Sequence, residues 1–229
     1  MLAASVVIFC LISGCASGDA AGPIPILNPP TARENPQQGG LVRAPVVMVL
    51  GDSFTAGSGP VPRWESYAAR AARTLGWQLV TAGAAGTGFV NPGRVRRTFQ
   101  QSFDAELSWR PAPDLLILSG GHNDHTTPGR VYGAARRLLM TARARWPRTR
   151  VVVIGPIWMG PEPRWVPAVR DAIAVAADEE ATVFLDPLDH PWGRGAILPD
   201  GVHPTFLGHR RLANWLVTAL REHGAEPDG

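Results

Sequence analysis

The sequence predicts an α/β protein, a three-layer α/β/α domain with a central parallel sheet of about five strands. Two patterns predict it. Short apolar runs rich in Val, Ile and Leu alternate with longer segments in which apolar residues recur at helical spacing. Strands and helices in alternation form right-handed βαβ units, so the strands run parallel and helices cover both faces of the sheet. Of the 229 residues, 45% are hydrophobic and 18% are charged, which is typical of a chain with a buried core.

Five short apolar runs are predicted as buried strands because they are rich in β-branched residues and too short for helices. The first, 46–50, ends at Gly51-Asp52-Ser53, where the glycine lets the backbone turn sharply. Ser53 is therefore expected at the carboxyl end of a strand, the edge at which open α/β sheets bind ligands. The other four predicted strands are 77–82, 115–118, 151–154 and 182–185.

Five segments are predicted as helices, and most of them carry one apolar face. The apolar face expected for 64–75 consists of Trp64, Ala68, Ala71, Ala72 and Leu75, with Arg70 and Arg73 opposite. The clearest pattern is in 130–146, where the apolar positions are Val131, Ala135, Leu138, Leu139, Ala142 and Trp146. A polar helix is expected over 99–107, and the last two helices over 166–177 and 206–220.

The first fifteen residues resemble an export signal. The apolar run from Leu2 to Ile12 is too short to span a bilayer as a helix, which takes about 20 residues. Ile12-Ser13-Gly14-Cys15 resembles a bacterial lipobox, in which the cysteine is lipidated. No positive charge precedes the run, and Ile stands where Leu is commonest, so a plain cleaved signal or a short membrane-embedded tail is the alternative. Each version places the domain outside the cytoplasm, either lipid-anchored to the membrane or secreted.

The remaining chain divides into three parts. Residues 16–44 are rich in Gly, Pro, Asn and Gln and predict a flexible tether. Residues 45–223 are expected to form one catalytic domain, followed by a disordered tail over 224–229. Both cysteines, Cys10 and Cys15, precede the domain, which therefore has no disulfide or thiol chemistry. We expect a monomer.

Composition and glycine spacing argue against nucleotide and nucleic-acid partners. The net charge of +3 and the pI near 9.5 come from 22 scattered arginines rather than from one basic stripe, so no nucleic acid is expected as a partner. The chain has no lysine, which excludes a P-loop. The glycines of 83–88 follow the order G-x-x-G-x-G, which differs from the G-x-G-x-x-G of dinucleotide-binding folds.

A second polar pair precedes the last helix, in Leu198-Pro199-Asp200-Gly201-Val202-His203-Pro204. At this spacing the carboxylate of Asp200 can hold one imidazole nitrogen of His203 while the other faces a hydroxyl, as nucleophilic serine catalysis requires. Alone, Asp-x-x-His is more often an ordinary surface turn. Its combination with Ser53, with the glycine-rich turn after the second strand and with Asn123 after the third strand is more informative, because all four fall on one sheet edge.

With these motifs, 46–220 resembles the SGNH (GDSL-like) hydrolases, whose fold is a flavodoxin-like α/β/α sandwich. The matching segments, in the order of that family, are Gly51-Asp52-Ser53, Gly86 within 82–86, Gly121-His122-Asn123-Asp124, and Asp200-Gly201-Val202-His203-Pro204. The resemblance implies that Ser53 attacks an acyl carbonyl, His203 is the base, and Asp200 orients it. It also implies an oxyanion hole made by the backbone N–H groups of Ser53 and Gly86 and the amide of Asn123. No cofactor and no metal are expected.

The chain departs from the family pattern at two places. Phe54 stands where relatives usually carry Leu, which we expect to affect packing rather than chemistry. Thr81-Ala82-Gly83 replaces the common Asn-Ala-Gly, which removes a supporting hydrogen bond but leaves the oxyanion glycine. We expected Gly86 to be glycine because a side chain would hinder the approach of the oxyanion.

Other polar and aromatic residues have structural and functional interpretations. Asp52 is expected to be a structural hydrogen-bonding residue. His122, His125 and Asp124 lack the further ligands of a zinc site and are better interpreted as substrate-pocket residues. Asp186, Asp189 and His190 are most simply a turn. The aromatic residues from Trp158 to Trp165 form a rim that stacks on a sugar or acyl chain, or else pack in the core. The candidate pocket residues are Phe54, His122, Trp158 and Trp165.

The leading hypothesis is a lipid-anchored or secreted serine esterase that hydrolyses O-acyl esters of small molecules, carbohydrates or lipids. An envelope O-acyltransferase would use the same residues with another acceptor, and a non-catalytic envelope-binding lipoprotein is the third hypothesis. A metallophosphoesterase is disfavoured because Thr55 stands where its second acidic residue is needed. An α/β-hydrolase is disfavoured because Ser53 is not in a G-x-S-x-G elbow.

Overall fold

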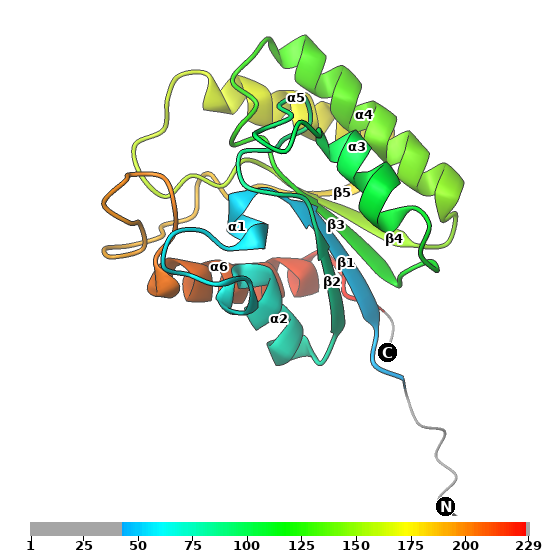
Figure 1. The fold of residues 1–229 in the computed structure, drawn as a ribbon, viewed down its shortest axis with the longest axis horizontal. Helices are drawn as coiled ribbons and strands as arrows, with labels where there is room; N and C mark the ends of the chain where they lie inside the picture. Colours follow the sequence, from blue (N-terminus) through cyan, green and yellow to red (C-terminus); the bar gives the residue numbers. More distant parts are fainter. Residues whose placement is uncertain (1–42, 228–229) are drawn as a thin grey trace, which may run out of the picture. The chain divides into compact units, whose positions relative to one another are not determined.

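The computed structural model describes residues 43–227, which form a five-stranded parallel sheet between two layers of helices (Figure 1). The strand order is β2-β1-β3-β4-β5, and every neighbouring pair is parallel. The strands are β1 (Val46–Gly51), β2 (Gln78–Ala82), β3 (Leu115–Ser119), β4 (Arg150–Ile154) and β5 (Val183–Leu185). The predicted three-layer α/β/α architecture is confirmed. The first strand, β1, lies between β2 and β3, and β3 is the central strand.

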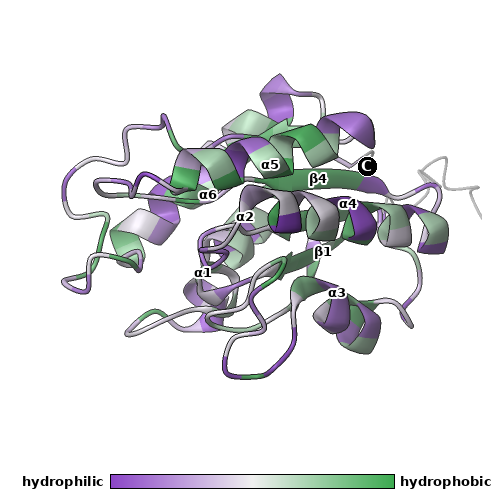
Figure 2. Ribbon diagram, turned by 90° about the horizontal axis from the view of Figure 1, so that it is seen from above, coloured by the Kyte–Doolittle hydropathy of each residue, from purple (hydrophilic) through white to green (hydrophobic). Residues whose placement is uncertain are grey.

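Each strand is a nearly continuous run of apolar residues because helices cover both faces of the sheet. Successive side chains point to opposite faces, so Met48 and Leu50 pack with one set of helices while Val47 and Val49 pack with the other. In Figure 2 the apolar sheet runs between helices whose outward surfaces are polar. This double burial supplies the core that a chain without disulfides needs.

Each helical layer has its own members (Figure 1). One face of the sheet is covered by α3 (Phe99–Ser102), α4 (Pro128–Arg145) and α5 (Val166–Glu179), and the other by α2 (Tyr67–Leu75) and α6 (Phe206–Glu222). A short helix, α1 (Ser53–Ala56), follows β1 directly. All six apolar positions predicted for the 130–146 helix are buried: Val131, Ala135, Leu138, Leu139, Ala142 and Trp146.

The start of the predicted 64–75 helix is wrong. The chain forms one 3₁₀ turn, Arg63–Glu65, and α2 begins only at Tyr67, because Ser66 has an extended backbone and its Oγ accepts from the N–H of Ala69 at 3.4 Å. The side chain of Trp64 consequently lies outside the core and is 69% exposed. Tyr67, which is fully buried, fills the place that we had given to Trp64.

The predicted 99–107 helix is confirmed in extent, but it is not polar throughout. Phe99, Phe103 and Leu107 are all fully buried and recur every four residues, so one face of this segment belongs to the core. The second half, Phe103–Leu107, is a π-helical turn, in which Ser108 N–H bonds the carbonyl of Phe103 at 2.9 Å.

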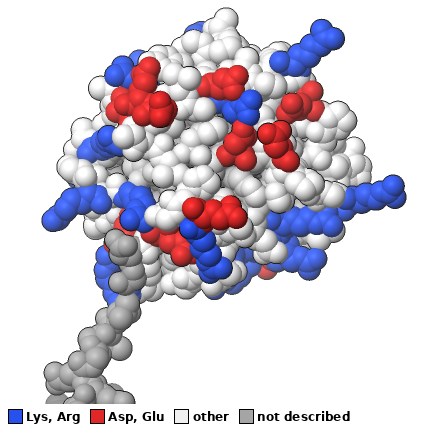
Figure 3. Space-filling model, turned by 180° about the vertical axis from the view of Figure 1, so that it is seen from behind, with Lys and Arg blue, Asp and Glu red and all other residues white. Residues whose placement is uncertain are grey.

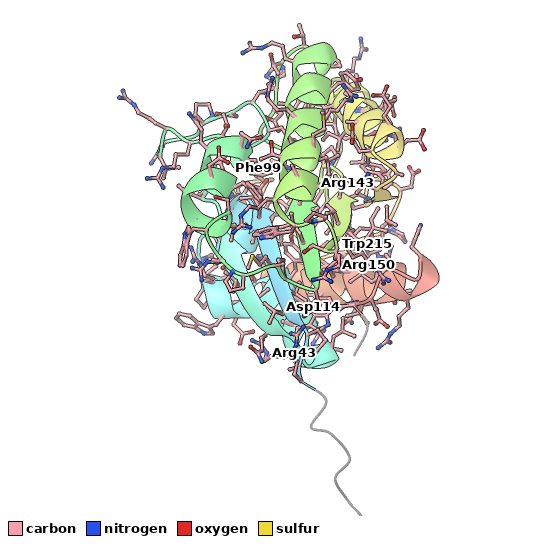
Figure 4. The ribbon with its side chains drawn as sticks, turned by 90° about the vertical axis from the view of Figure 1, so that its right-hand side faces the viewer. Arg43, Phe99, Asp114, Arg143, Arg150 and Trp215 are labelled. Carbon is pink, nitrogen blue, oxygen red and sulfur yellow. The ribbon has the colours of Figure 1, made fainter. Side chains whose placement is uncertain are left out.

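The described ends of the chain are held to the domain. Arg43, the last part of the predicted tether, pairs with Asp114 at 2.6 Å at the amino end of the sheet (Figure 4). The expected disordered tail is wrong for 224–227, since Ala225 is 1% exposed and its N–H bonds the carbonyl of Leu220 at 2.8 Å. The predicted signal and lipobox, and residues 16–42 of the predicted tether, lie outside the described residues.

The surface of the described domain carries interspersed charges. On the face opposite to that of Figure 1, acidic and basic side chains alternate rather than forming one basic stripe (Figure 3). None of the helices within 43–227 is long and apolar enough to cross a membrane.

A buried histidine couples α6 to α2 and makes stability depend on pH. His209 is fully buried, its Nδ1 accepts from the N–H of Tyr67 at 3.1 Å, and its Nε2 has no partner among residues 43–227. Burial, together with the charges of Arg70 and His203, lowers the pKa of His209 to about 4. The native state therefore holds this imidazole neutral, whereas the unfolded chain protonates it near its ordinary pKa of about 6.5.

We expect the free energy of unfolding to fall by up to about 3 kcal/mol as the pH drops from about 6.5 to about 4, because only the unfolded state binds the proton in this window. Urea titrations at intervals across this range measure the effect. A His209→Gln variant, whose side-chain oxygen also accepts the Tyr67 N–H, should lose this part of the pH dependence. An unchanged pH profile in the variant would contradict the assignment.

Candidate active site

The candidate site lies at the carboxyl edge of the sheet, where the loops after β1, β4 and β5 gather (left in Figure 1). Ser53 is the first residue of α1, directly after β1, and is 3% exposed. Asp52 caps this helix, with its Oδ1 accepting from the N–H of Phe54 at 3.0 Å. Gly51 permits the turn, because a Cβ there would stand 2.2 Å from the hydroxyl oxygen of Thr55.

The structure brings His203 to Ser53, although 150 positions separate them in the sequence. The imidazole Nε2 lies 3.1 Å from Ser53 Oγ, and Nδ1 lies 2.8 Å from Asp200 Oδ2. This is the nucleophile, base and orienting carboxylate arrangement. Asp200 fixes Nδ1 as the protonated nitrogen, which leaves the lone pair of Nε2 facing the hydroxyl of Ser53.

Asp200 also builds the turn that carries the base. Its Oδ1 accepts from the N–H of Val202 at 2.9 Å and from the N–H of His203 at 3.0 Å. Hydrogen bonds from the His203 side chain and from these two backbone groups lower the pKa of Asp200 to about 2. The carboxylate is therefore ionised at neutral and mildly acid pH, even though the side chain is 47% exposed.

The amide of Asn123 joins the nucleophile loop to the Gly86 turn. Its Nδ2 donates to the carbonyl of Thr87 at 3.0 Å and to Asp52 Oδ2 at 3.3 Å. A Cβ at Gly86 would meet no protein atom closer than 3.9 Å, so the expected hindrance of the oxyanion by a side chain stays a prediction. The residue is glycine because its φ is +78°, a conformation that side chains disfavour.

Asp52 has the structural role that we expected. It is 4% exposed and accepts from the backbone of α1 and from Asn123. Burial raises the pKa of Asp52 to about 7. The hydrogen bond from Phe54 N–H and the nearby imidazole of His203 both act in the opposite direction, but they are outweighed. Gly83 packs against the same turn, since a Cβ there would stand 2.0 Å from the carbonyl oxygen of Gly51.

Sequence reasoning missed the role of Asp124 and Asn91 in holding the oxyanion segments together, and the interpretation of Asp124 as a substrate-pocket residue is wrong. Asp124, which is 1% exposed, accepts from three consecutive N–H groups of Phe89, Val90 and Asn91 at 2.9 to 3.0 Å. The side chain of Asn91 donates to the carbonyl of Asn123 at 2.9 Å and accepts from the N–H of Gly93 at 3.0 Å. The Asn-Pro-Gly sequence at 91–93 is a turn signal that could have indicated this brace.

The four candidate pocket residues lie in one aromatic cluster, but they differ in exposure. The prediction of Phe54 as a pocket residue is wrong, because its side chain is 1% exposed and packs in the core; its expected packing role is confirmed. Its ring lies 6.1 Å from His203 and 5.2 Å from His122, between centroids. His122, Trp158 and Trp165 are half-buried, and His125 is exposed. Within the described residues, no group of three or more His, Cys, Asp or Glu could hold a metal ion.

The polar cluster after β5 is a turn, as we predicted. Asp186 pairs with Arg170 and accepts from the N–H of Leu188 at 3.0 Å. His190 lies 4.5 Å from Trp192 between ring centroids, away from the serine and its partners. This cluster therefore belongs to the connection between β5 and α6.

Comparison with known proteins agrees with this geometry. The sequence profile of the GDSL-like lipase/acylhydrolase family matches residues 49–211. No curated protein matches the chain.

Solved structures of esterases share the fold. A psychrotrophic esterase, EstA, from Pseudoalteromonas sp. is 16% identical with a TM-score of 0.63, over 80% of this chain and all of that one. Est24, a carbohydrate acetylesterase from Sinorhizobium meliloti, is 20% identical with a TM-score of 0.62, over 78% and 99%. A family two carbohydrate esterase from Clostridium thermocellum, in complex with cellohexaose, is 16% identical with a TM-score of 0.66, over 80% and 66%.

Proposed function

The chain belongs to the GDSL-like lipase/acylhydrolase family and is a serine hydrolase that acts on ester bonds, and from this premise we propose that it cleaves O-acyl esters through an acyl-enzyme on Ser53. One observation carries the proposal. Ser53 Oγ lies 3.1 Å from His203 Nε2, while His203 Nδ1 lies 2.8 Å from the Asp200 carboxylate. Both are hydrogen-bond distances, so the proton path from hydroxyl to base needs no rearrangement.

In the first half of the proposed reaction, Ser53 Oγ attacks the acyl carbonyl carbon and His203 Nε2 takes the hydroxyl proton. The negative charge on the carbonyl oxygen is met by the N–H groups of Ser53 and Gly86 and by the amide of Asn123, which exchanges its 3.3 Å hydrogen bond to Asp52 Oδ2 for one to the oxyanion. Loss of one such donor typically costs about 2.7–4 kcal/mol of transition-state stabilisation. The tetrahedral species then expels the alcohol, which leaves with the proton from His203.

In the second half, water takes the place of the alcohol. His203 accepts one water proton as the oxygen attacks the acyl-enzyme, and it returns this proton to Ser53 Oγ as the carboxylic acid leaves. The two steps need no cofactor, since each proton removed by the imidazole is given back in the same half-reaction. An acid pH should stop turnover, because a protonated imidazole cannot act as the base.

We place this activity outside the cytoplasm. The support is the N-terminal sequence, an apolar run followed by Ile12-Ser13-Gly14-Cys15 and then by a segment rich in Gly and Pro. Lipidation of Cys15 would leave the domain tethered to the membrane as a monomer, and cleavage without lipidation would release it. The ester substrate would then be a small molecule or part of the cell envelope.

The test is hydrolysis of p-nitrophenyl acetate by the full chain, combined with labelling by a fluorophosphonate and mass spectrometry of the labelled peptide. We expect ester cleavage that is insensitive to chelators, and a single label on Ser53 that abolishes it. Turnover without labelling of Ser53, or a label on another serine with loss of activity, would contradict the proposal. Labelling of Ser53 without release of the acid would favour transfer to an acceptor other than water.

A further inference from the structure

A row of aromatic rings leads away from the catalytic imidazole. His203 lies 6.1 Å from Phe54, Phe54 lies 5.2 Å from His122, and His122 stacks on Trp158 at 4.3 Å, all between ring centroids. The His122 and Trp158 rings are inclined by only 18°. Phe54 and His122 therefore connect the ring of Trp158 to the catalytic imidazole through a continuous series of ring contacts.

Trp158 is held rigidly but is not covered. Its Nε1–H donates to the carbonyl of Pro161 at 3.0 Å, His122 covers one face, and Trp165 meets it edge to face at 5.8 Å. The indole nevertheless remains half-buried. Since His122 covers one face of the Trp158 indole, the accessible surface of the indole is its other face and its free edge. A fixed aromatic surface of this kind binds a ligand with little loss of side-chain entropy.

His122 supplies a polar group beside this surface. Its Nδ1–H donates to the carbonyl of Ile157 at 2.9 Å, and burial lowers its pKa, so the ring is neutral. The lone pair is therefore on Nε2, which no other described residue bonds and which is not among the buried unpartnered atoms of the described residues. A neutral imidazole fixed in this tautomer is a hydrogen-bond acceptor for a hydroxyl.

We infer that Trp158 and His122 form a subsite for a pyranose ring in the alcohol part of the ester, which makes O-acylated saccharides the substrate class. This inference rests on the proposed esterase function. The C–H face of the sugar would lie on the face of the Trp158 indole that His122 leaves open, with the imidazole stacked behind it. A saccharide has both features, a flat apolar face and hydroxyls at its rim.

The apolar residues beside the base fit an acyl chain less well. A long acyl group needs an enclosed apolar surface that buries most of its length. Phe54, whose ring lies 6.1 Å from that of His203 between centroids, is 1% exposed and offers no such surface. The side chains of His203 and Asp200 are 29% and 47% exposed, which leaves the mouth of the site open to a chain of sugars.

The test compares two acetyl esters, acetylated xylotriose and ethyl acetate, on the full chain. We expect Trp158→Ala to lower the ratio of kcat/KM for the saccharide ester over ethyl acetate about tenfold, mainly through KM, as the loss of one stacking interaction implies. Trp158→Phe should restore part of the ratio. The matched control is Trp109→Ala, because Trp109 is also exposed but lies before β3, on the opposite edge of the sheet.

Calorimetry with unacylated xylotriose, cellotriose and N-acetylglucosamine trimer separates this inference from the proposed function, because it needs no turnover. We expect at least one oligosaccharide to bind the unaltered chain and the Trp109→Ala variant, and to bind Trp158→Ala more weakly. Hydrolysis of ethyl acetate without saccharide preference or oligosaccharide binding would overturn the subsite and leave the esterase intact. An equal loss on both esters, or a loss confined to long-acyl esters, would also overturn it. Oligosaccharide binding without any ester hydrolysis would overturn only the esterase.

Discussion

Replacement of Ser53 or His203 by alanine is expected to lower kcat for p-nitrophenyl acetate by about a millionfold, and the double replacement is expected to cost no more than either one. The two side chains act as a unit, joined by the 3.1 Å contact between Ser53 Oγ and His203 Nε2. Without the hydroxyl there is nothing to acylate, and without the imidazole the hydroxyl keeps its proton. The residual rate should come from the oxyanion donors alone.

Steady-state kinetics on the three variants, with circular dichroism to show that each is folded, measures this effect. Ser58→Ala is the matched control, since this serine lies in the loop after α1 and its enclosed hydroxyl has no hydrogen-bond partner in the described part of the chain. Its removal should leave activity and stability almost unchanged. If the losses of the two single variants multiplied in the double variant, Ser53 and His203 would be acting separately, and the proposed mechanism would fail.

The sheet and the pairing of Asp200 with His203 could be predicted because each depends on a local pattern, whereas the pairing of Ser53 with His203 was implied by the family resemblance. Strands buried on both faces are unbroken apolar runs, so β1, β3 and β4 are visible in the sequence to within one residue. The Asp200-His203 spacing is likewise local, since the carboxylate reaches both the ring and the backbone of its own turn. Parallel strands then bring the ends of distant segments to one edge.

The remaining features depend on contacts that spacing does not reveal. Ser66, a better helix cap than its neighbours, moves the start of α2 past Trp64 and exposes the indole. The sequence alone left a metal-ligand role for Asp124 to be weighed. In the structure its carboxylate instead accepts hydrogen bonds from three consecutive N–H groups of the loop 89–91. Ala225 is buried only because α6 ends against the sheet, which the Gly- and Pro-containing tail does not indicate.

Asp200→Asn is expected to lower kcat by about 10⁴-fold, nearly as much as Asp200→Ala. The asparagine oxygen can still accept from the N–H groups of Val202 and His203, so the turn should persist. Its NH₂ group, however, would face His203 Nδ1 and donate to it. The proton of the neutral imidazole would then move to Nε2, which could no longer accept from the hydroxyl of Ser53.

The pair of variants separates two roles of the carboxylate. If Asp200 served only to build the turn, Asp200→Asn would remain within about tenfold of the unaltered chain, and only Asp200→Ala would be impaired. The pKa of Asp200, lowered to about 2 by its hydrogen bonds, means that its own protonation does not cause the acid loss of activity. Raising the pH should therefore not rescue the activity of Asp200→Asn, because the imidazole proton is on the wrong nitrogen at every pH at which the ring is neutral.

Steady-state kinetics between pH 5 and pH 9 would measure this, with Asp189→Asn, in the turn after β5, as the control. The Asp200 carboxylate is 47% exposed, so solvent weakens its electrostatic attraction for a protonated His203. The tautomer of the neutral imidazole, however, is set by the hydrogen bond between Asp200 and Nδ1. We therefore expect a large loss of kcat in Asp200→Asn in spite of the exposure.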